Sequence, residues 1–405
     1  MTYLLENDTK NITEDIIKRK EFYKYKIIKD DDSHDHNKVN IIPRFFIEKM
    51  IRNNSILQFS SYQMFVNNYI NPNTPYTRIL LKHETGTGKT IGSLSIALNF
   101  INYYKKESSD FLDIGSIFII GFTSAQFKSE LLRFPELGII SRLELYKLKL
   151  LKKQSYTGNK IDLEKLQEYM MKIRKRFNNR EGNGFFQFKG YKKLVNELFI
   201  IKDNKIILSD LNEDDVFKHI EDGKIILNES LLKQFKNSLV ICDEIHNTYN
   251  SKDKNNWGIA LQYILNYHPS IRSVFLSATP INNNPTEIVD LLNLLLPHKL
   301  YPNRLYKSDL FDKNQNLKRN SLDKIAELCT GRISYLRDIN PLYFPTKTFI
   351  GECIPGASYL KFIRCPMSNF HYNTYKSVFM RNLSLDSQYL IDFAIPNPKN
   401  NNIGI

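Results

Sequence analysis

Residues 83–90 of this chain read His83-Glu84-Thr85-Gly86-Thr87-Gly88-Lys89-Thr90. An apolar run of strand type ends just before them at residues 79–81, and an apolar stretch of helical period follows at residues 91–100. A strand, a glycine-rich loop and a helix in this order are typical of a phosphate-binding loop, whose backbone N–H groups and helix N-terminus hold phosphate oxygens. The segment therefore predicts an α/β fold built on a parallel sheet.

The residue types in this loop each suit a phosphate ligand. Gly86 and Gly88 let the backbone come close to a phosphate and adopt positive φ. Lys89 is expected to place its ammonium on the β- and γ-phosphates of ATP, and Thr90 to coordinate Mg²⁺ through its hydroxyl. One position departs from the general pattern, which has glycine where His83 stands. The alternative is a glycine-rich strand-to-helix turn with a solvated lysine.

A second motif follows another short apolar run. Residues 239–242 have the character of a fully buried parallel strand, and Asp243 and Glu244 come directly after it. Because ligands of open α/β sheets bind at the carboxyl ends of strands, both acids are expected to face the phosphate loop. Asp243 is predicted to hold Mg²⁺, and Glu244 to orient and deprotonate the attacking water. Taken alone, the pair would be read as a plain acid pair at a turn, because such pairs are common.

A third motif, Ser277-Ala278-Thr279, ends the apolar run at residues 274–276. His246 lies two residues beyond Glu244, and a neutral imidazole there can form a hydrogen bond with the hydroxyl of Ser277 or Thr279. Such a contact would couple the γ-phosphate site to a neighbouring lobe. The alternative for His246 is an ordinary loop histidine.

Upstream of the loop, Gln63 is a candidate for adenine recognition. Its amide can pair with both a donor and an acceptor on the base, which would favour ATP over other nucleotides. The alternative is a glutamine on a helix surface. The predicted nucleotide-binding set comprises Gln63, His83, Glu84, Thr85, Gly86, Thr87, Gly88, Lys89 and Thr90.

The three motifs together resemble those of superfamily 2 DExH-box ATPases, the group that includes the chromatin remodellers. Within it, the chain is most similar to helicase-like ATPases of large DNA viruses: the small subunit of the poxvirus early transcription factor, nucleoside triphosphatase I, and their asfarvirus and giant-virus relatives. The similarity covers residues 55–300 well and residues 330–400 loosely. The residues that carry it are 83–90, 243–247 and above all 277–297, with weaker echoes at 121–124, 131–136 and 363–368.

The resemblance implies a P-loop RecA-like lobe with helices on both faces of its parallel sheet, and the start of a second, incomplete RecA-like lobe. It implies ATP and Mg²⁺ as cofactors. It also implies that a residue other than glycine is tolerated at the position of His83. The implied activity is that of a helicase or translocase in viral transcription, with DNA favoured over RNA. Viral RNA polymerase or transcription-factor subunits are implied partners, in the virion or in viral factories of the host cytoplasm.

Members of this group complete the ATP site with arginines from the second lobe, in a Q-x-x-G-R-x-x-R-like motif. This sequence lacks that motif, and its last arginine is Arg381. We therefore expect the chain by itself to bind ATP, hydrolyse it slowly and leave a duplex intact. The first alternative is an ATP-binding, weakly hydrolysing subunit of a viral transcription or packaging assembly. A small-molecule kinase is a more distant alternative, against which the Ser277-Ala278-Thr279 element argues.

The composition agrees with a nucleic-acid partner without requiring one. The chain has 405 residues and a formal net charge of +14, and phosphate contacts dominate nucleic-acid binding. Abundant Lys, Asn and Ile, as AT-rich genomes encode, are an equally good explanation of the charge. The four cysteines show no paired metal-ligand spacing. No apolar run reaches the ~20 residues that cross a bilayer, and the N-terminus lacks a signal-peptide layout, so neither a membrane partner nor secretion is expected.

The order of segments predicts four regions. Residues 1–55 are a charged extension whose first 40 residues are expected to bury little, and residues 56–300 are the ATPase lobe. A basic helical insertion is expected at about residues 140–235, where residues 147–176 carry ten Lys or Arg against three Asp or Glu. It could follow a DNA backbone, or it could be a solvated helix face. Residues 301–345 are predicted to be a polar linker, and residues 346–405 the beginning of the second lobe.

Overall fold

The structure is a computed structural model. The structure describes residues 12–23, 57, 59–106, 114–122, 124–156, 160–179, 184–203, 206–249, 256–336, 350–354, 357–362, 366–379, 395–396 and 403–404. The chain divides into two compact units, residues 1–338 and residues 339–405.

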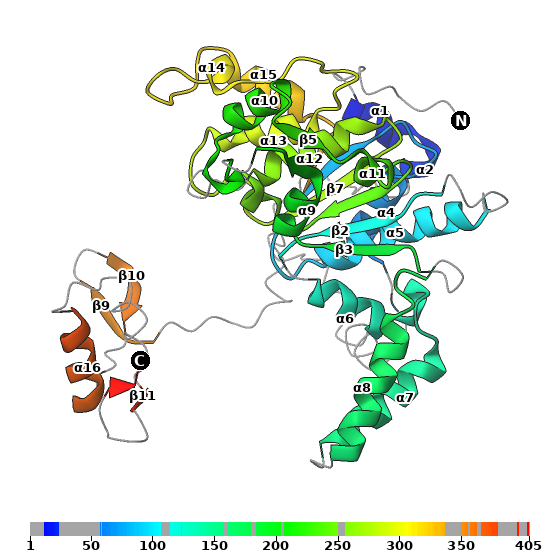
Figure 1. Cartoon of the computed structure of the whole chain (residues 1–405), viewed down its shortest axis with the longest axis vertical. Helices are drawn as coiled ribbons and strands as arrows, with labels where there is room; N and C mark the ends of the chain where they lie inside the picture. Colours follow the sequence, from blue (N-terminus) through cyan, green and yellow to red (C-terminus); the bar gives the residue numbers. More distant parts are fainter. Residues whose placement is uncertain are drawn as a thin grey trace, which may run out of the picture. The chain divides into compact units, whose positions relative to one another are not determined.

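The first unit is built on a sheet of six strands in the order β3-β2-β6-β7-β1-β8, drawn in Figure 1. All of the strand pairings in this sheet are parallel. In chain order the strands are β1 (Arg78–His83), β2 (Ile117–Ile120), β3 (Phe186–Lys189), β6 (Leu239–Cys242), β7 (Arg272–Ser277) and β8 (Ile333–Leu336). The predicted α/β fold with a parallel sheet is therefore confirmed.

The four central strands are buried on both faces, because their residues alternate between two apolar cores. Leu80, Val240 and Phe275 pack in one core, whereas Ile79, Ile241 and Val274 pack in the other. A strand that is apolar at every position satisfies both faces at once, which is why these segments read as continuous apolar runs rather than alternating ones.

Helices cover each face of the sheet, as Figure 1 shows. Among the described residues, no helix combines the length and apolar character needed to cross a membrane. Packed in the first core are α9 (Tyr191–Leu198), α10 (Glu213–Glu221), α11 (Glu229–Lys233), α12 (Trp257–Tyr267), α13 (Glu287–Leu295), α14 (Lys307–Leu310) and α15 (Ser321–Cys329). Packed in the second core are α1 (Ile12–Lys18), α2 (Lys20–Tyr23), α4 (Ser61–Tyr69), α5 (Lys89–Lys106), α6 (Ala125–Arg133), α7 (Arg142–Ser155) and α8 (Lys160–Arg174).

Two regions differ from their sequence-based expectation. The stretch 301–345, expected to be a polar linker, contains α14, α15 and β8, and β8 adds a sixth strand beside β1. In the expected insertion at 140–235, only α7 and α8 form a helical hairpin. The chain then returns through β3, the edge strand next to β2, and through a two-stranded antiparallel sheet of β4 (Phe199–Ile201) and β5 (Ile225–Leu227).

The charged N-terminal region also differs from expectation in its described part. Ile12, Ile16 and Phe22, on α1 and α2, are each at most 3% exposed and belong to the second core. The expectation that the first 40 residues bury little is therefore wrong for residues 12–23. Charged side chains on α1 and α2 are compatible with burial, because each short helix needs only one apolar face.

The second unit contains only a few described elements. β9 (Glu352–Ile354) pairs antiparallel with β10 (Ala357–Phe362), and β11 (Ile395–Pro396) pairs antiparallel with β12 (Ile403–Gly404). Helix α16 spans Asn369–Phe379. Residues 363–365, part of one of the weaker echoes, lie outside the described residues. The start of a second RecA-like lobe at 346–405 stays a prediction.

Candidate functional site

The three motifs come together because their strands are neighbours in the sheet. The glycine-rich loop follows β1, the acid pair follows β6, and Ser277 ends β7, which lies between the other two strands. In a parallel sheet all of these strands end at the same edge. Residues separated by more than 150 positions in the sequence thus converge on one edge of the sheet, as the sequence predicted.

The loop has the backbone geometry of an anion cradle. Gly86 and Gly88 have φ of 86° and 81°, the left-handed region that favours glycine. A Cβ at Gly88 would lie 2.9 Å from Nε2 of Gln63, so a larger residue there would displace the end of that side chain in addition to straining the backbone. Helix α5 begins immediately afterwards at Lys89, which places its free N–H groups beside the loop.

Lys89 bonds to the loop, and the charges of the acid pair act on it. Its ammonium donates to the backbone carbonyls of His83 and Glu84, at 2.9 and 3.2 Å. Burial lowers the pKa of Lys89, while the negative charges of Glu244 and Asp243 act to raise it. Because those charges act on the ammonium, the cation and both carboxylates share one site.

His83 stands at the position where the general loop pattern has glycine. Its φ is not positive, so a Cβ is allowed there. The imidazole is 2% exposed, its Nε2 lies 3.0 Å from Oγ of Ser334 on β8, and its ring packs edge-on against Tyr62. Burial, together with the charge of Lys89, lowers the pKa of His83 to about 4, so the ring is neutral at physiological pH. His83 contributes to the loop through its backbone carbonyl, which accepts from the Lys89 ammonium.

Gln63 and its neighbour Tyr62 clamp the loop from α4. Gln63 Nε2 donates to the carbonyl of Gly88 at 3.2 Å, and Gln63 Oε1 accepts from the backbone N–H of Ser60 at 2.9 Å. The Tyr62 hydroxyl donates to the carbonyl of Thr87. Since Gln63 is 6% exposed, the alternative of a helix-surface glutamine is wrong. Its expected contact with adenine stays a prediction, and its observed role is to hold the loop.

The remaining loop residues fall into two groups. Thr85 and Gly86 are exposed at the tip. Thr87 is buried, and its hydroxyl donates to the carbonyl of Glu84 at 2.7 Å, which closes the loop internally. Thr90 lies in the first turn of α5, directly after Lys89. The loop is thus fixed from within, and its tip is left open to a ligand.

The two carboxylates of the acid pair disfavour each other's ionised form. Burial and the charge of Glu244 raise the pKa of Asp243 to about 6, against the opposing effect of Lys89. Glu244 adopts φ 49° and ψ 53°, a left-handed conformation that costs a residue with a Cβ about 1–2 kcal/mol. Strain of this kind persists where the surrounding fold imposes it and is concentrated at functional sites.

Asp243 is also fixed by contacts that the sequence does not reveal. Its N–H donates to the carbonyl of Ile120 at 2.8 Å, and its carbonyl accepts from the Tyr191 hydroxyl at 2.7 Å. A Cβ at Gly121 would lie 3.1 Å from Cβ of Asp243, so β2 and β6 approach closely at this edge. Tyr191 follows an edge strand 52 positions before Asp243, and no local pattern marks that contact.

His246 joins the acid pair to the third motif. Its Nδ1 lies 3.0 Å from Oγ of Ser277 and 3.3 Å from Oε2 of Glu244. The predicted contact with Ser277 is therefore present. Thr279 takes part through its backbone N–H, which donates to Ser277 Oγ at 3.1 Å. One imidazole nitrogen thus faces both a carboxylate and a hydroxyl.

The raised pKa of Asp243 gives a stability prediction. A carboxyl whose folded pKa exceeds its unfolded value destabilises the fold as pH rises from about 4 to about 6, and the full cost persists above that range. We expect Asp243→Asn, without nucleotide or Mg²⁺, to raise the free energy of unfolding by about 1–2 kcal/mol at pH 7.5 and by much less at pH 4.5. Urea denaturation at both pH values measures this.

The matched control for that variant is Asp214→Asn, which removes an exposed carboxylate on α10 and should leave stability unchanged at both pH values. A loss of stability in Asp243→Asn at pH 7.5 would show that the carboxylate is favourably paired in the folded chain, contrary to the electrostatics described above.

Comparison with known proteins identifies one matching family. Residues 62–392 match the family described as SNF2-related domain. The matched segment includes α4, the glycine-rich loop, the acid pair and the Ser277-Ala278-Thr279 element, and it therefore contains the whole candidate site.

Similar proteins occur in several large DNA viruses. The early transcription factor large subunit homolog of African swine fever virus (isolate Pig/Kenya/KEN-50/1950) is 37% identical over 382 residues, covering 85% of this chain and 33% of that protein. A putative ATP-dependent RNA helicase of Acanthamoeba polyphaga mimivirus is 26% identical over 345 residues, covering 82% of this chain and 28% of that protein. A putative helicase of Invertebrate iridescent virus 3 is 26% identical over 280 residues, covering 68% and 23%.

This chain thus spans about a third or less of the length of these relatives. Their names support the broad resemblance to helicases of large DNA viruses. They do not support the narrower likeness to a small subunit of an early transcription factor, because the African swine fever virus relative is named for a large subunit.

Proposed function

The chain belongs to the SNF2-related family, and from this premise we propose that it is an ATPase that uses hydrolysis to act on a nucleic acid. The observation that carries the proposal is the convergence of the phosphate loop, the acid pair and the contact between His246 and Ser277 on one edge of the sheet. A nucleotide site alone would need only the first two. The third contact is what a site needs if it is to pass the state of its γ-phosphate to another part of an assembly.

The residues present fit ATP with Mg²⁺. The cradle of Gly86 and Gly88 suits phosphate oxygens, and Lys89 would exchange two backbone carbonyls for the β- and γ-phosphates. Thr90 and Asp243 would hold Mg²⁺, which when bound supplies positive charge that stabilises the phosphates and the ionised form of Asp243. The raised pKa of Asp243 supports this assignment, because burial and the charge of Glu244 destabilise its ionised form, which a metal ion would stabilise.

Glu244 is the proposed general base. Its side chain is half-exposed in the crevice, so it can reach a water molecule, and it lies beside a second carboxyl that would be occupied by metal. His246 is the proposed coupling residue, since it can transfer its hydrogen bond between Glu244 and Ser277. A change of charge at Glu244 would thereby change the environment of the loop after β7. Glu287 also fixes that loop by accepting from the N–H groups of Asn282 and Asn283.

The proposed target is DNA in the transcription of a large DNA virus, with RNA as the other candidate. The name of the African swine fever virus relative supports a role in early transcription, and the net charge of +14 supports a nucleic-acid partner. Viral RNA polymerase or transcription-factor subunits are the proposed protein partners, and the virion or a cytoplasmic viral factory the proposed location. We also propose that residues 346–405 begin a second lobe, because the family match runs to residue 392.

One assay tests the proposal and its target together. We expect the purified chain to hydrolyse ATP slowly in the presence of Mg²⁺, and duplex DNA to raise this slow rate more than single-stranded DNA or RNA does. The measurement is release of phosphate at saturating ATP with each nucleic acid in turn. Stimulation by RNA alone would move the target to RNA, and ATP binding without any stimulated turnover would favour the ATP-binding subunit over the motor.

A further inference from the structure

A groove between three helices lies apart from the nucleotide site. It has a volume of about 500 Å³ and is bounded by α6, α7 and α8. Helix α6 follows the carboxyl end of β2, so the groove begins at the same sheet edge as the acid pair. In Figure 1, α7 and α8 run side by side away from the sheet. One end of the groove is therefore near the edge that carries the nucleotide site.

The lining of the groove is strongly basic. Five of the residues that line it carry positive charge, and none is acidic: the cations are Lys128, Arg133, Lys149, Lys152 and Arg174. Its floor is apolar, with Leu145 and Leu148 of α7 among the lining residues, and Ser124 and Ser129 add hydroxyl groups. Hydroxyls and long cationic side chains over an apolar floor are the groups that contact phosphates and sugars of nucleic-acid backbones.

Four of these cations have no carboxylate to neutralise them in the described part of the chain. Arg133 lies 3.8 Å from Glu130, but no ion pair with a described residue involves Lys128, Lys149, Lys152 or Arg174. The neighbouring carboxylate of Glu144 is already paired with Arg176 at 2.6 Å. The groove therefore carries uncompensated charge that an anion could neutralise.

The cations also act on one another. Burial and the charge of Arg174 lower the pKa of Lys128, whose ammonium lies 4.7 Å from the ring centroid of Phe188. Repulsion between the like charges of Lys128 and Arg174 destabilises the protein, and a bound anion would reduce that repulsion.

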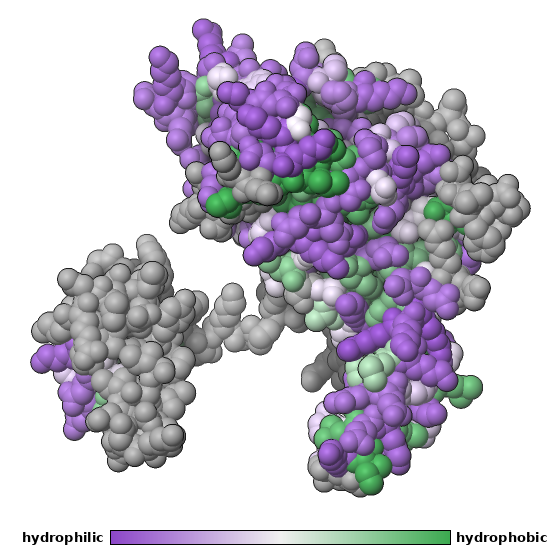
Figure 2. Space-filling view, in the orientation of Figure 1, coloured by the Kyte–Doolittle hydropathy of each residue, from purple (hydrophilic) through white to green (hydrophobic). Residues whose placement is uncertain are grey.

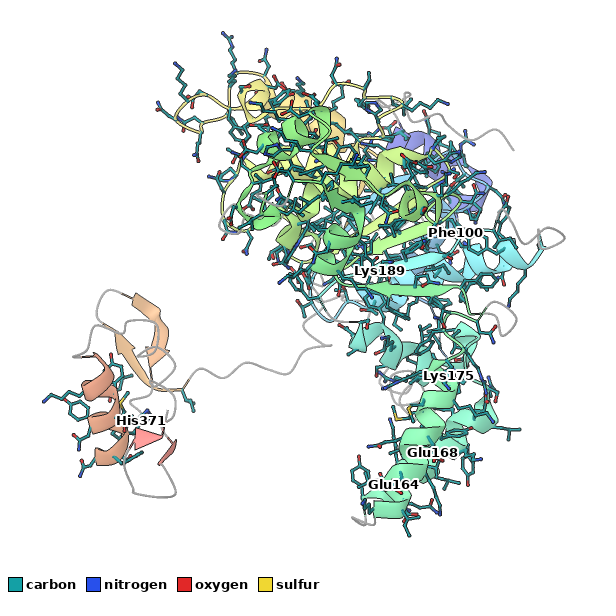
Figure 3. The ribbon with its side chains drawn as sticks, viewed as in Figure 1. Phe100, Glu164, Glu168, Lys175, Lys189 and His371 are labelled. Atoms are coloured by element: carbon teal, nitrogen blue, oxygen red, sulfur yellow. The ribbon has the colours of Figure 1, made fainter. Side chains whose placement is uncertain are left out.

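Basic residues occur along the whole hairpin. Lys152 lies in the last turn of α7, and Arg174 lies in the last turn of α8. Figure 3 shows Glu164 and Glu168 toward the free end of α8 and Lys175 toward the sheet. Figure 2 shows a mainly hydrophilic surface over the hairpin, with hydrophobic residues near its free end.

We propose that the groove between α6, α7 and α8 binds the sugar–phosphate backbone of the nucleic acid on which the chain acts. This inference rests on the proposed function for the identity of the ligand and extends it to a second site. We assign the groove to the backbone because Lys, Arg and hydroxyl side chains are the groups that make most contacts with phosphate and sugar oxygens. It adds affinity that is independent of sequence, and it holds the nucleic acid near the ATP site.

The test is the salt dependence of nucleic-acid binding. The variant Lys149→Gln/Lys152→Gln changes two exposed side chains and keeps their aliphatic stems. Binding of a fluorescein-labelled 20-base-pair duplex is measured by anisotropy between 50 and 200 mM KCl, and repeated with single-stranded DNA and duplex RNA. We expect the slope of log K against log salt to fall in magnitude by about 1–2, and affinity at 100 mM KCl to fall by on the order of 10- to 100-fold, whatever the sequence.

The matched control is Lys233→Gln/Lys236→Gln, which removes two exposed lysines at the same spacing. They lie before β6 at the opposite edge of the sheet, so this variant should bind like the parent. If the parent binds the duplex and the groove variant shows the same salt slope, the proposed role of the groove is wrong and the proposed function still stands. The exposed apolar residues of the hairpin would then point to a protein partner. A parent that binds no nucleic acid at all would overturn both.

Discussion

Lys89→Ala is expected to weaken ATP binding by about 100-fold. The ammonium of Lys89 is the group in the loop that the proposed mode of binding places on the β- and γ-phosphates, and hydrogen bonds between charged partners contribute about 1.5–3 kcal/mol each. About 1.4 kcal/mol corresponds to a factor of ten in affinity. In the structure, this ammonium holds two loop carbonyls. The variant therefore also loses part of the order of the loop, which adds to the effect.

Titration of a fluorescent ATP analogue with Mg²⁺ measures this affinity directly. Lys82→Ala is the matched control, because it removes the same charge from β1 but from a side chain that lies over the ring of Tyr335, at 4.5 Å from its centroid. The control should bind ATP as the parent does. Equal affinities for the parent and Lys89→Ala, with unchanged thermal unfolding, would show that the loop does not hold the phosphates.

The parts of the site that the sequence predicted are those encoded by adjacent residues. The loop, the acid pair and the Ser277-Ala278-Thr279 element are each a few residues long, and each follows a run of buried strand residues. Since the ends of parallel strands share one edge, the motifs could be brought together without knowing the order of the strands. The contact between His246 and Ser277 followed from the same reasoning.

The contacts that escaped prediction join segments that are distant in the sequence. Ser334, the partner of His83, lies 251 positions away on β8, in a segment whose polar composition suggested a linker. As an edge strand, β8 has a half-buried burial pattern and lacks the continuous apolar run that marks the central strands. Its position beside β1 depends on the whole sheet, which local periodicity does not encode.

The burial of α1 and α2 and the contact of Tyr191 with Asp243 escaped prediction for a similar reason. Phe22 and its neighbours on α1 and α2 are apolar residues isolated among charges, and they are buried only because the second core offers them a surface. Tyr191 stabilises Asp243 through a main-chain carbonyl, and any residue could supply that carbonyl. A hydrogen bond from a side chain to a backbone atom does not restrict the residue type of its partner, so the sequence does not reveal it.

Glu244→Gln is expected to lower the rate of ATP hydrolysis by about 10²–10⁴-fold, the usual contribution of a positioned general base, while ATP affinity stays within about threefold of the parent. Glutamine keeps the Cβ, Cγ and one acceptor oxygen of glutamate. The left-handed backbone at residue 244 therefore costs the same in both chains, and the contact with His246 can persist. What disappears is the negative charge that accepts a proton from the attacking water.

The same substitution has a second consequence that distinguishes a base from a structural carboxylate. The charge of Glu244 contributes to the raised pKa of Asp243, so its removal should lower that pKa toward the ordinary value and favour the ionised form that Mg²⁺ needs. We therefore expect tighter Mg²⁺-dependent ATP binding at pH 6 in Glu244→Gln than in the parent, together with lost turnover. Phosphate release and nucleotide titration at pH 6 and 8 separate the two effects, with Glu221→Gln, an exposed carboxylate at the end of α10, as the control. If turnover persists at the parental rate, the base is another group, and if affinity at pH 6 falls, Glu244 is itself a ligand of the metal-bound nucleotide.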